Sequence, residues 1–265
     1  YKFAKNIDGI ARMYSKISSF VHSVLRNEHL PLIISGDHSS AGGTIAGVKM
    51  AFPSKRIGVI WIDAHADLHT PYTTPSGNVH GMSLASVIGI DNKENQINPV
   101  TQHEADLWNI LKNTGGVGKK INPEDMVFVG LRSLEKQEQE LIDQYGIKCF
   151  DVEKTRNLGI KESAEKILSC FDKCDMIFLS FDVDSLDPSV SMGTGTPVEN
   201  GFYVNELKQM IDILTKSNKI SCMETTEVNP TLDYENRMSE AVIEILEIAA
   251  KNLNKTDTSQ WSPKV

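Results

Sequence analysis

The 265-residue sequence contains only four cysteines, and no two of them form a Cys-x-x-Cys pair. They are Cys149, Cys170, Cys174 and Cys222. Four cysteines in a chain of this length do not build a disulfide framework, and their spacing does not suit a zinc site. We therefore expect reduced, partly buried thiols in a cytoplasmic protein.

Long apolar runs and excess positive charge are also missing. No run approaches the roughly 18 apolar residues of a membrane span, and no signal peptide is recognisable. The formal net charge of −8 argues against a protein that binds nucleic acid by charge. We expect a small-molecule partner instead of a membrane or a nucleic acid. The sequence begins at Tyr1 without an initiator Met, so we expect a trimmed N-terminus.

Segments with helical and strand patterns alternate along the chain. The patterns predict helices near 3–24, 42–52, 104–111, 135–145, 161–171, 204–215 and 237–253, and one that starts near Gly81. They predict strands near 32–35, 57–62, 126–129, 147–150 and 176–181, and one that begins with 219–223. Such alternation predicts an α/β fold whose mainly parallel sheet is covered on both faces. No segment resembles a linker between domains, and the residues from about Asn254 are expected to fray.

Metal-capable side chains follow the apolar strand at 57–62. They are Asp63, His65, Asp67 and His69, spaced two apart, and in an extended chain alternate side chains share one side. A second apolar strand ends in Asp182 and Asp184, a third in Asp37-His38, and a fourth in Glu224 to Glu227. The carboxyl ends of parallel strands meet at one edge of a sheet, which is where ligands bind in such folds.

Each of these residues also has a structural explanation when taken alone. Asp63 and Asp67 are able to cap turns, Asp37 to cap a helix, and His38 to make an ordinary hydrogen bond. Taken together, however, clustered carboxylates repel one another unless a cation lies between them. The joint pattern therefore favours a metal site.

The proposed ligands indicate which metal is bound. They are two imidazoles and four carboxylates, from His38, His65, Asp63, Asp67, Asp182 and Asp184. Six ligands are too many for one tetrahedral zinc, and oxygen-rich ligation with some imidazole suits Mn²⁺ best. Two divalent ions would balance four carboxylates and would activate a bridging water as the nucleophile. A site with a single zinc ion is the weaker alternative.

Five motifs, in order and spacing, resemble the signatures of the ureohydrolases, and most closely those of arginase. They are Gly36-Asp37-His38-Ser39, Asp63-Ala64-His65-Ala66-Asp67, Ser76-Gly77-Asn78-Val79-His80-Gly81, the run from Ser180 to Pro188, and Glu227-Val228-Asn229-Pro230. The resemblance covers roughly residues 30–250 and implies a single domain over 1–265 with a three-layer α/β/α sandwich. It also implies two Mn²⁺ ions and a homo-oligomer, commonly a trimer or hexamer.

By this resemblance, His38 and Asp67 hold one ion, and His65 and Asp184 hold the other. Asp63 and Asp182 bridge the two ions. A metal-bridging hydroxide attacks the guanidinium carbon and urea is released. Asp67 orients this hydroxide, Glu227 pairs with the guanidinium nitrogens, and His80 shuttles protons, a task that suits an unperturbed pKa of about 6.5.

The resemblance also assigns the far end of the substrate. Ser76 and Asn78 match residues that receive the α-carboxylate, which agmatine lacks. Glu138 matches an acid near the α-amino group, and Thr196 matches a residue that lines the guanidinium pocket. His69 and Glu135 depart from the family, which usually has Asn and Asp there. The family also has one or two strands before the helix that opens this chain, which agrees with a trimmed N-terminus.

These observations favour an arginase-like enzyme that converts L-arginine to L-ornithine and urea. The alternative is a sister amidinohydrolase acting on formiminoglutamate or another guanidino acid, which His69 and Glu135 keep open. A metal-binding module without catalysis would keep the six ligands but would not need His80 and Glu227. A related one-zinc fold that acts on acetylated amines would not need both Asp182 and Asp184.

Overall fold

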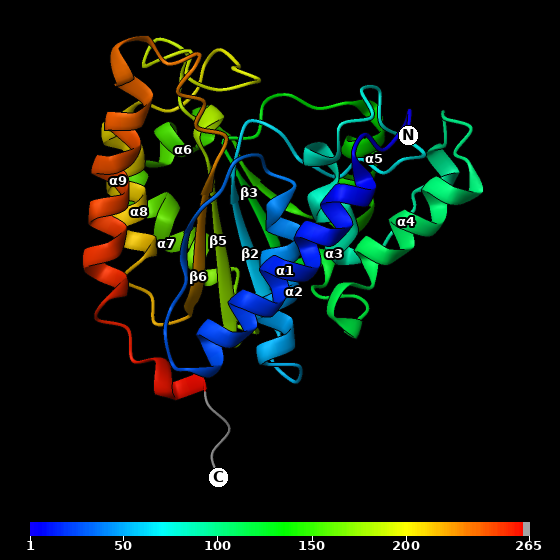
Figure 1. The fold of residues 1–265 in the computed structure, drawn as a ribbon. Helices are drawn as coiled ribbons and strands as arrows, with labels where there is room; N and C mark the ends of the chain where they lie inside the picture. Colours follow the sequence, from blue (N-terminus) through cyan, green and yellow to red (C-terminus); the bar gives the residue numbers. More distant parts are fainter. Residues whose placement is uncertain (262–265) are drawn as a thin grey trace.

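The structure, a computed structural model, describes residues 1–261 and has a six-stranded sheet at its centre. The strands are β1 (Leu32–Ile34), β2 (Ile57–Ile62), β3 (Met126–Val129), β4 (Lys148–Phe150), β5 (Met176–Asp182) and β6 (Ile220–Thr226). They lie in the order β1-β6-β5-β2-β3-β4, and every neighbouring pair is parallel (Figure 1). The predicted parallel α/β sheet is therefore confirmed.

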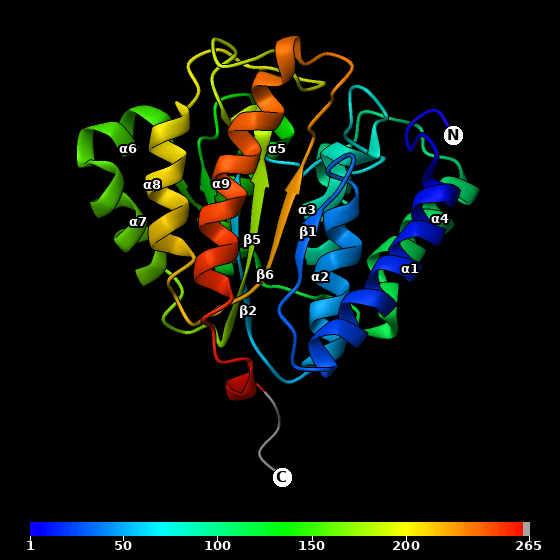
Figure 2. The ribbon, with the colours of Figure 1, turned by 60° about the vertical axis from the view of Figure 1, so that its left-hand side comes forward.

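Helices cover both faces of this sheet (Figures 1 and 2). They are α1 (Ile7–Arg26), α2 (Ser40–Ala51), α3 (Ser83–Ile88), α4 (Gln102–Lys112), α5 (Lys136–Tyr145), α6 (Val152–Leu158), α7 (Ile160–Ser169), α8 (Val204–Leu214) and α9 (Arg237–Leu253). One layer contains α1, α2, α3 and α5, and the other contains α7, α8 and α9, with α6 at its edge. The predicted three-layer α/β/α sandwich is confirmed.

Alternation along β2 explains why this strand is apolar throughout. Val59 and Trp61 pack into the core beneath α1 and α2, whereas Ile60 and Ile62 pack into the core beneath α7, α8 and α9. All six residues of β2 are buried, as in a strand covered on both faces. Each fully buried large apolar side chain contributes about 1.5–3 kcal/mol, so the two cores hold the sheet rigidly beneath the loops at its carboxyl edge.

The observed elements differ most from the predicted ones at α1 and α6. Helix α1 begins at Ile7 and not near Phe3, because Asn6 has a left-handed backbone with φ 58°. Helix α6 was not predicted, although the Asp151 side chain caps it by accepting a hydrogen bond from the Lys154 N–H. Strand β6 runs to Thr226, within the end predicted for it, and its polar residues 224–226 pair with β5 and β1 and are fully buried.

The end of the described chain packs against the body of the protein. Residues Thr258–Trp261 form a 3-10 helix, and the Trp261 side chain joins the core beneath α1 and α2. The segment from Asn254 that was expected to fray thus packs against the protein up to Trp261, and its remaining residues, 262–265, lie outside the described residues. Within residues 1–261, no helix has the length and apolar character needed to cross a membrane.

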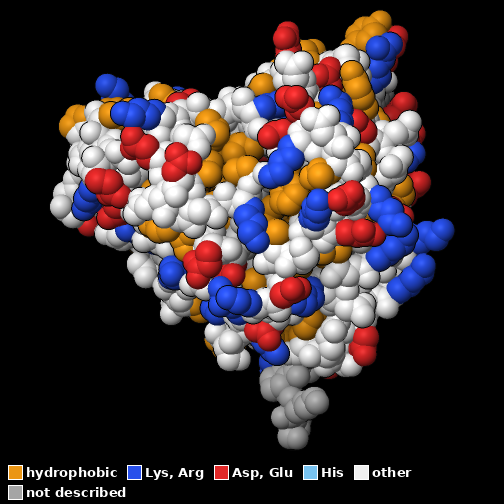
Figure 3. All heavy atoms as spheres, turned by 180° about the vertical axis from the view of Figure 1, so that it is seen from behind, with side chains coloured by type: hydrophobic (Ala, Val, Ile, Leu, Met, Phe, Trp, Pro, Cys, Tyr) orange, Lys and Arg blue, Asp and Glu red, His pale blue; other side chains and the backbone are white. Residues whose placement is uncertain are grey.

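One face of the molecule carries charged side chains of both signs. On the side that Figure 3 shows, acidic and basic side chains are interspersed with apolar ones. Mixed charge of this kind keeps a surface hydrated but does not create a field of one sign over that face.

Candidate active site

Segments far apart in the sequence meet at the carboxyl edge of the sheet. Asp63 directly follows β2, Asp182 is the last residue of β5, and Asp184 lies in the 3-10 helix that follows. His38 comes from the loop that connects β1 to α2. Because β5 pairs with β2, the two carboxylate runs lie side by side although more than a hundred residues separate them.

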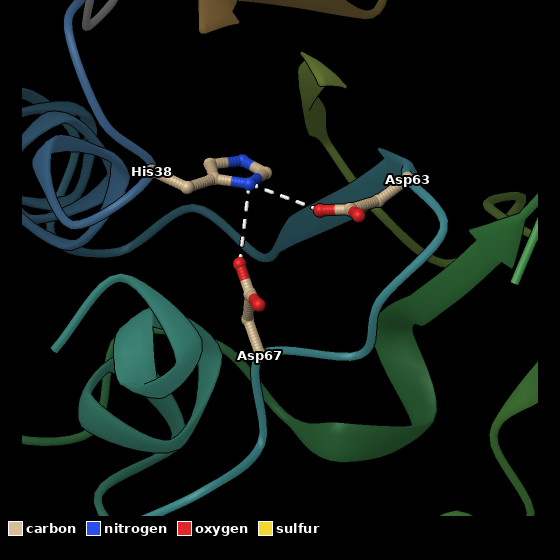
Figure 4. A group of neighbouring side chains, drawn as sticks. All are labelled: His38, Asp63 and Asp67. Atoms are coloured by element: carbon tan, nitrogen blue, oxygen red, sulfur yellow. Dashed lines mark ion pairs between the residues drawn. The ribbon is translucent and has the colours of Figure 1, made fainter. Parts of the chain in front are cut away.

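Three carboxylate oxygens surround one ring nitrogen of His38. The Nδ1 atom lies 3.0 Å from Asp63 Oδ2, 3.1 Å from Asp67 Oδ2 and 3.0 Å from Asp182 Oδ2. Figure 4 shows His38, Asp63 and Asp67 converging on one point from the loop before α2, the end of β2 and the loop after it. All four side chains are buried.

A second convergence lies beside the first. His65 Nδ1 is 2.9 Å from Asp184 Oδ2 and 3.4 Å from Asp63 Oδ1. Asp63 thus contributes one carboxylate oxygen to each convergence. His38, Asp63 and Asp67 form one group of possible metal ligands, and Asp63, His65 and Asp184 form another. All six residues predicted as ligands lie in this double cluster.

The possible ligand atoms of this cluster are better suited to bind cations than to form hydrogen bonds with one another. His38 Nδ1, Asp63 Oδ2 and Asp67 Oδ2 are buried, and none has a hydrogen-bond partner of acceptable geometry. The other ring nitrogen, His38 Nε2, lies 2.7 Å from Ser180 Oγ. When Nε2 carries the proton and donates it to Ser180, the Nδ1 lone pair faces three carboxylates. Such an arrangement is stable only with a cation between the groups.

The ionisation of these groups shows the same demand for positive charge. Burial raises the pKa of Asp182 well above its usual range, and the charges of Asp184 and Asp63 raise it further. Burial and Asp63 likewise raise the pKa of Asp184. Although burial opposes it, hydrogen bonds to Asp184 and Asp63 raise the pKa of His65 to about 12. Protons thus neutralise this cluster when no other cation does.

Residues without a predicted role hold His38 in place. The Trp61 indole stacks on the imidazole with ring centroids 4.0 Å apart, and Ser180 Oγ accepts from or donates to its Nε2. Trp61 and Ser180 are directly opposite each other in β2 and β5. The alternation that places Asp63 and Asp182 on one side places these two residues on that side as well. That signal was present in the sequence.

Arg132 supports the loops around the cluster, and no motif indicated it. Its guanidinium donates to the backbone carbonyls of Gly130, Asp184, Leu186, Val198 and Glu199. Burial lowers the pKa of Arg132, and the charge of Asp184 opposes this shift. Arg132 therefore ties the loop after β3 to the loop after β5 at the metal-ligand cluster.

A cavity of about 210 Å³ opens beside the cluster. Its lining includes two predicted ligands, His65 and Asp67, as well as His80. It also includes all six residues assigned to the substrate, which are His69, Ser76, Asn78, Glu135, Glu138 and Thr196. Ser133, which had no predicted role, lines the cavity too. The arrangement suits a small linear molecule whose one end reaches the carboxylate cluster.

His69 does not lie with the residues that precede it in the alternating run. Its Nε2 atom is 3.0 Å from Glu135 Oε2 and 3.5 Å from Glu138 Oε2, and its Nδ1 atom is 3.2 Å from Thr73 Oγ1. The alternation ends because Asp67 has a left-handed backbone with φ 50°. His69 is therefore outside the two groups that contain Asp63, although it lines the same cavity as His65 and Asp67.

The pKa values of the two glutamates beside His69 are shifted in opposite directions. Burial raises the pKa of Glu138 well above its usual range, and its hydrogen bond with Glu135 raises it further. The hydrogen bond from His69 lowers the pKa of Glu135, against the effect of burial. The Leu68 N–H donates to Glu138 at 3.0 Å. This end of the cavity is acidic, and His69 holds the outer carboxylate in place.

Glu227 and His80 approach each other near the first ligand group. The Glu227 carboxylate accepts the His38 N–H at 2.8 Å, and its Oε1 lies 4.0 Å from His80 Nδ1. Glu227 has φ 68°, a conformation held by its N–H donating to the Gly36 carbonyl at 2.9 Å. Burial raises the pKa of Glu227, and its hydrogen bond to the His38 backbone opposes this shift.

Thr196 contacts a predicted metal ligand directly. Its Oγ1–H donates to Asp184 Oδ2 at 3.1 Å. The residue lies in the loop after β5 and lines the cavity. Thr196 therefore orients the Asp184 carboxylate as well as bordering the space that a substrate would occupy.

Comparisons with known proteins agree with this geometry. The sequence matches the model of the arginase family over residues 4–250. An arginase from Bacillus subtilis is 36% identical over 243 residues, which are 92% of this chain and 76% of that protein. An arginase from Bacillus caldovelox is 35% identical over 243 residues, which are 91% of this chain and 75% of that protein.

Solved structures show the same relationship. The crystal structure of arginase from Bacillus subtilis superposes with a TM-score of 0.84 at 35% identity, over 96% of this chain and 81% of that chain. A formimidoylglutamase from Bacillus subtilis superposes with a TM-score of 0.72 at 22% identity, over 91% of this chain and 67% of that chain, which shows a shared fold. The chain therefore belongs to the arginase family of ureohydrolases.

Proposed function

We propose that this ureohydrolase uses two Mn²⁺ ions to hydrolyse L-arginine to L-ornithine and urea. One observation carries the proposal: two groups of possible ligand residues share Asp63 and adjoin a cavity lined by His69, Ser76, Asn78, Glu135, Glu138 and Thr196, whereas Glu227 is not among the lining residues. A metal site without catalytic function would not need this cavity. A site for one ion would not need two groups.

The ligand groups indicate how the ions would be held. His38 and Asp67 would hold one ion, His65 and Asp184 the other, and Asp63 and Asp182 would contact both. The pair of ions, when bound, supplies Lewis-acid chemistry that activates a water molecule near neutral pH. Four carboxylates and imidazole nitrogens suit Mn²⁺, which accepts five or six ligands, better than zinc.

Asp67 is suited to orient the attacking water. It lines the cavity as well as contacting His38, so its carboxylate borders both the ligand cluster and the substrate space. Accepting a hydrogen bond from the water would aim a lone pair of that water at the guanidinium carbon. Such positioning of reactants is a large part of catalytic acceleration.

Glu227 would bind the cationic end of the substrate. Its side chain is only 14% exposed and its position is held by the backbone of His38. A planar guanidinium favours a carboxylate opposite its paired N–H groups. Because burial already raises the pKa of Glu227, an incoming cation would stabilise its charged form.

His80 would move protons between the reaction and solvent. It borders the cavity, and about a third of its side chain is exposed. It belongs to neither ligand group, so its ring nitrogens stay free for proton transfer. We propose that His80 protonates the leaving amine and is then reprotonated by bulk water.

The far end of the cavity supports an amino-acid substrate. Ser76 and Asn78 offer hydrogen-bond donors for an α-carboxylate, and Glu135 and Glu138 offer negative charge for an α-amino group. The contact of His69 with Glu135 supports a second candidate, the hydrolysis of formiminoglutamate or another guanidino acid. His69 and Glu135 stand where the family usually has Asn and Asp. Their contact therefore gives a different hydrogen-bond pattern at the end of the cavity where these substrates differ.

Two further properties belong to the proposal. The family resemblance supports a homo-oligomer, a trimer or a hexamer, which light scattering coupled to gel filtration would measure. The four free cysteines, two of them buried, support a reducing cytoplasmic location.

One assay tests the proposed reaction. The protein is loaded with Mn²⁺, and urea release is measured with L-arginine and agmatine, while formamide release is measured with formiminoglutamate. We expect urea from L-arginine and little from agmatine, because agmatine leaves the Ser76 and Asn78 donors unpaired. Formamide release without arginine hydrolysis would replace this reaction with the second candidate.

A further inference from the structure

The first residues of the chain pack against the loop that carries Ser76 and Asn78. The Lys5 N–H donates to the Gly77 carbonyl at 2.8 Å. Gly77 has φ +77°, and a Cβ atom there would lie 2.2 Å from the Lys2 carbonyl oxygen. The loop therefore takes its shape against residues 2–5, which places this segment at the amino-acid end of the cavity.

Lys5 also contacts the loop through its side chain. Its ammonium group donates to Asn78 Oδ1 at 3.1 Å. This contact engages the oxygen of the Asn78 amide and leaves the NH₂ group on the opposite side. Within residues 1–261, that NH₂ group donates to no protein atom, and Lys5 has no carboxylate partner. Both groups remain available to a ligand.

The cavity needs positive charge at this end if it receives a carboxylate. Its lining carries Asp67, Glu135 and Glu138 but no Lys or Arg among the described residues. An anionic group that enters such a space is repelled unless a cation lies nearby. Asn78 lines the cavity, and the Lys5 ammonium group donates a hydrogen bond to it. This contact places a positive charge next to the cavity lining.

We propose that Lys5 is a specificity-determining residue that acts through Asn78. It fixes the Asn78 amide with the NH₂ group toward the substrate, and it places positive charge beside the site of the α-carboxylate. The inference rests on the proposed function, because it requires a substrate that carries a carboxylate at this end.

The experiment replaces Lys5→Gln in the full chain loaded with Mn²⁺. We expect KM for L-arginine to rise about two- to fivefold, as for the loss of an exposed charge contact, with kcat unchanged. The affinity for agmatine, measured by competition against L-arginine, should not change because agmatine has no carboxylate. High salt should reduce the difference in KM for L-arginine between the wild type and Lys5→Gln. The variant Lys5→Arg should restore the wild-type KM.

The matched control is Lys2→Gln, which removes an exposed charge from the same segment but not the contact with Asn78. Urea release by the wild-type enzyme tests the proposed reaction by itself. In an enzyme that passes that test, an unchanged KM for L-arginine in Lys5→Gln would overturn the role of Lys5. Equal loss of affinity for arginine and agmatine would also overturn it, since that result would show a structural effect on the loop.

Discussion

The replacement Asp182→Asn should affect the metal-bound protein and the metal-free protein differently. Asp182 is 2% exposed, and Oδ2 lies 3.0 Å from His38 Nδ1. Burial and the charges of Asp184 and Asp63 raise its pKa, so without metal the ionised carboxylate is disfavoured in this position. With two divalent ions the same charge is required. We therefore expect the substitution to weaken metal binding while it leaves the metal-free fold intact.

The magnitude follows from the charge that is lost. Two unit charges at 4 Å attract by about 4 kcal/mol at an effective dielectric constant near 20, and this carboxylate faces both proposed ions. A loss of affinity of about 100-fold is therefore a modest expectation. It would reduce the stabilisation by Mn²⁺ by about 2.7 kcal/mol. For a chain of this size that lowers the metal-induced rise in Tm by about 5–10 °C.

The assay measures Tm by scanning calorimetry in chelator and in MnCl₂, together with the metal content of the purified protein. Asp143→Asn is the matched control, because it makes the same charge change at an exposed position on α5, remote from the ligand groups. If Asp182→Asn keeps both the wild-type metal content and the wild-type rise in Tm, the assignment of Asp182 as a shared ligand is wrong.

Three other substitutions test separate parts of the account. His80→Ala should keep both metals but slow turnover about 10²–10⁴-fold, and full activity at neutral pH would exclude the proton shuttle. His69→Asn should lower KM for L-arginine by about fivefold, the value of one hydrogen bond, whereas loss of arginine hydrolysis with gain of formamide release would favour the second substrate. Burial lowers the pKa of Lys120 to about 8, so the unfolded chain binds more protons between pH 8 and 10 and stability rises with pH in that range. The free energy of unfolding of wild type minus Lys120→Met, from denaturant titrations, should therefore grow by about 1.4 kcal/mol per pH unit there, and a flat difference would contradict the burial of the charge.

The sequence indicated the candidate ligand cluster because two regularities coincide. Alternation puts Asp63 and Trp61 on one side of β2, and Asp182 and Ser180 on one side of β5. The parallel sheet then brings the carboxyl ends of these strands together. Both regularities are visible without coordinates, so the sequence could predict that these six candidate ligand residues lie together.

Other features depend on the backbone beyond the strand ends, where alternation no longer applies. The left-handed conformation of Asp67 turns the chain and places His69 against Glu135 instead of the metal ligands. Arg132 binds carbonyls of the loops after β3 and β5, and neither its type nor its spacing indicated that task. The contact of Lys5 with Asn78 joins positions 73 residues apart, which sequence pattern alone does not connect.

Anomalous diffraction at the manganese edge, from crystals of the protein grown with MnCl₂, tests the central claim most directly. We predict two anomalous peaks, one bordered by His38 and Asp67 and the other by His65 and Asp184, with Asp63 reaching both. A map without peaks there, in which His38 Nδ1 still faces the carboxylates directly, would contradict the two-metal account.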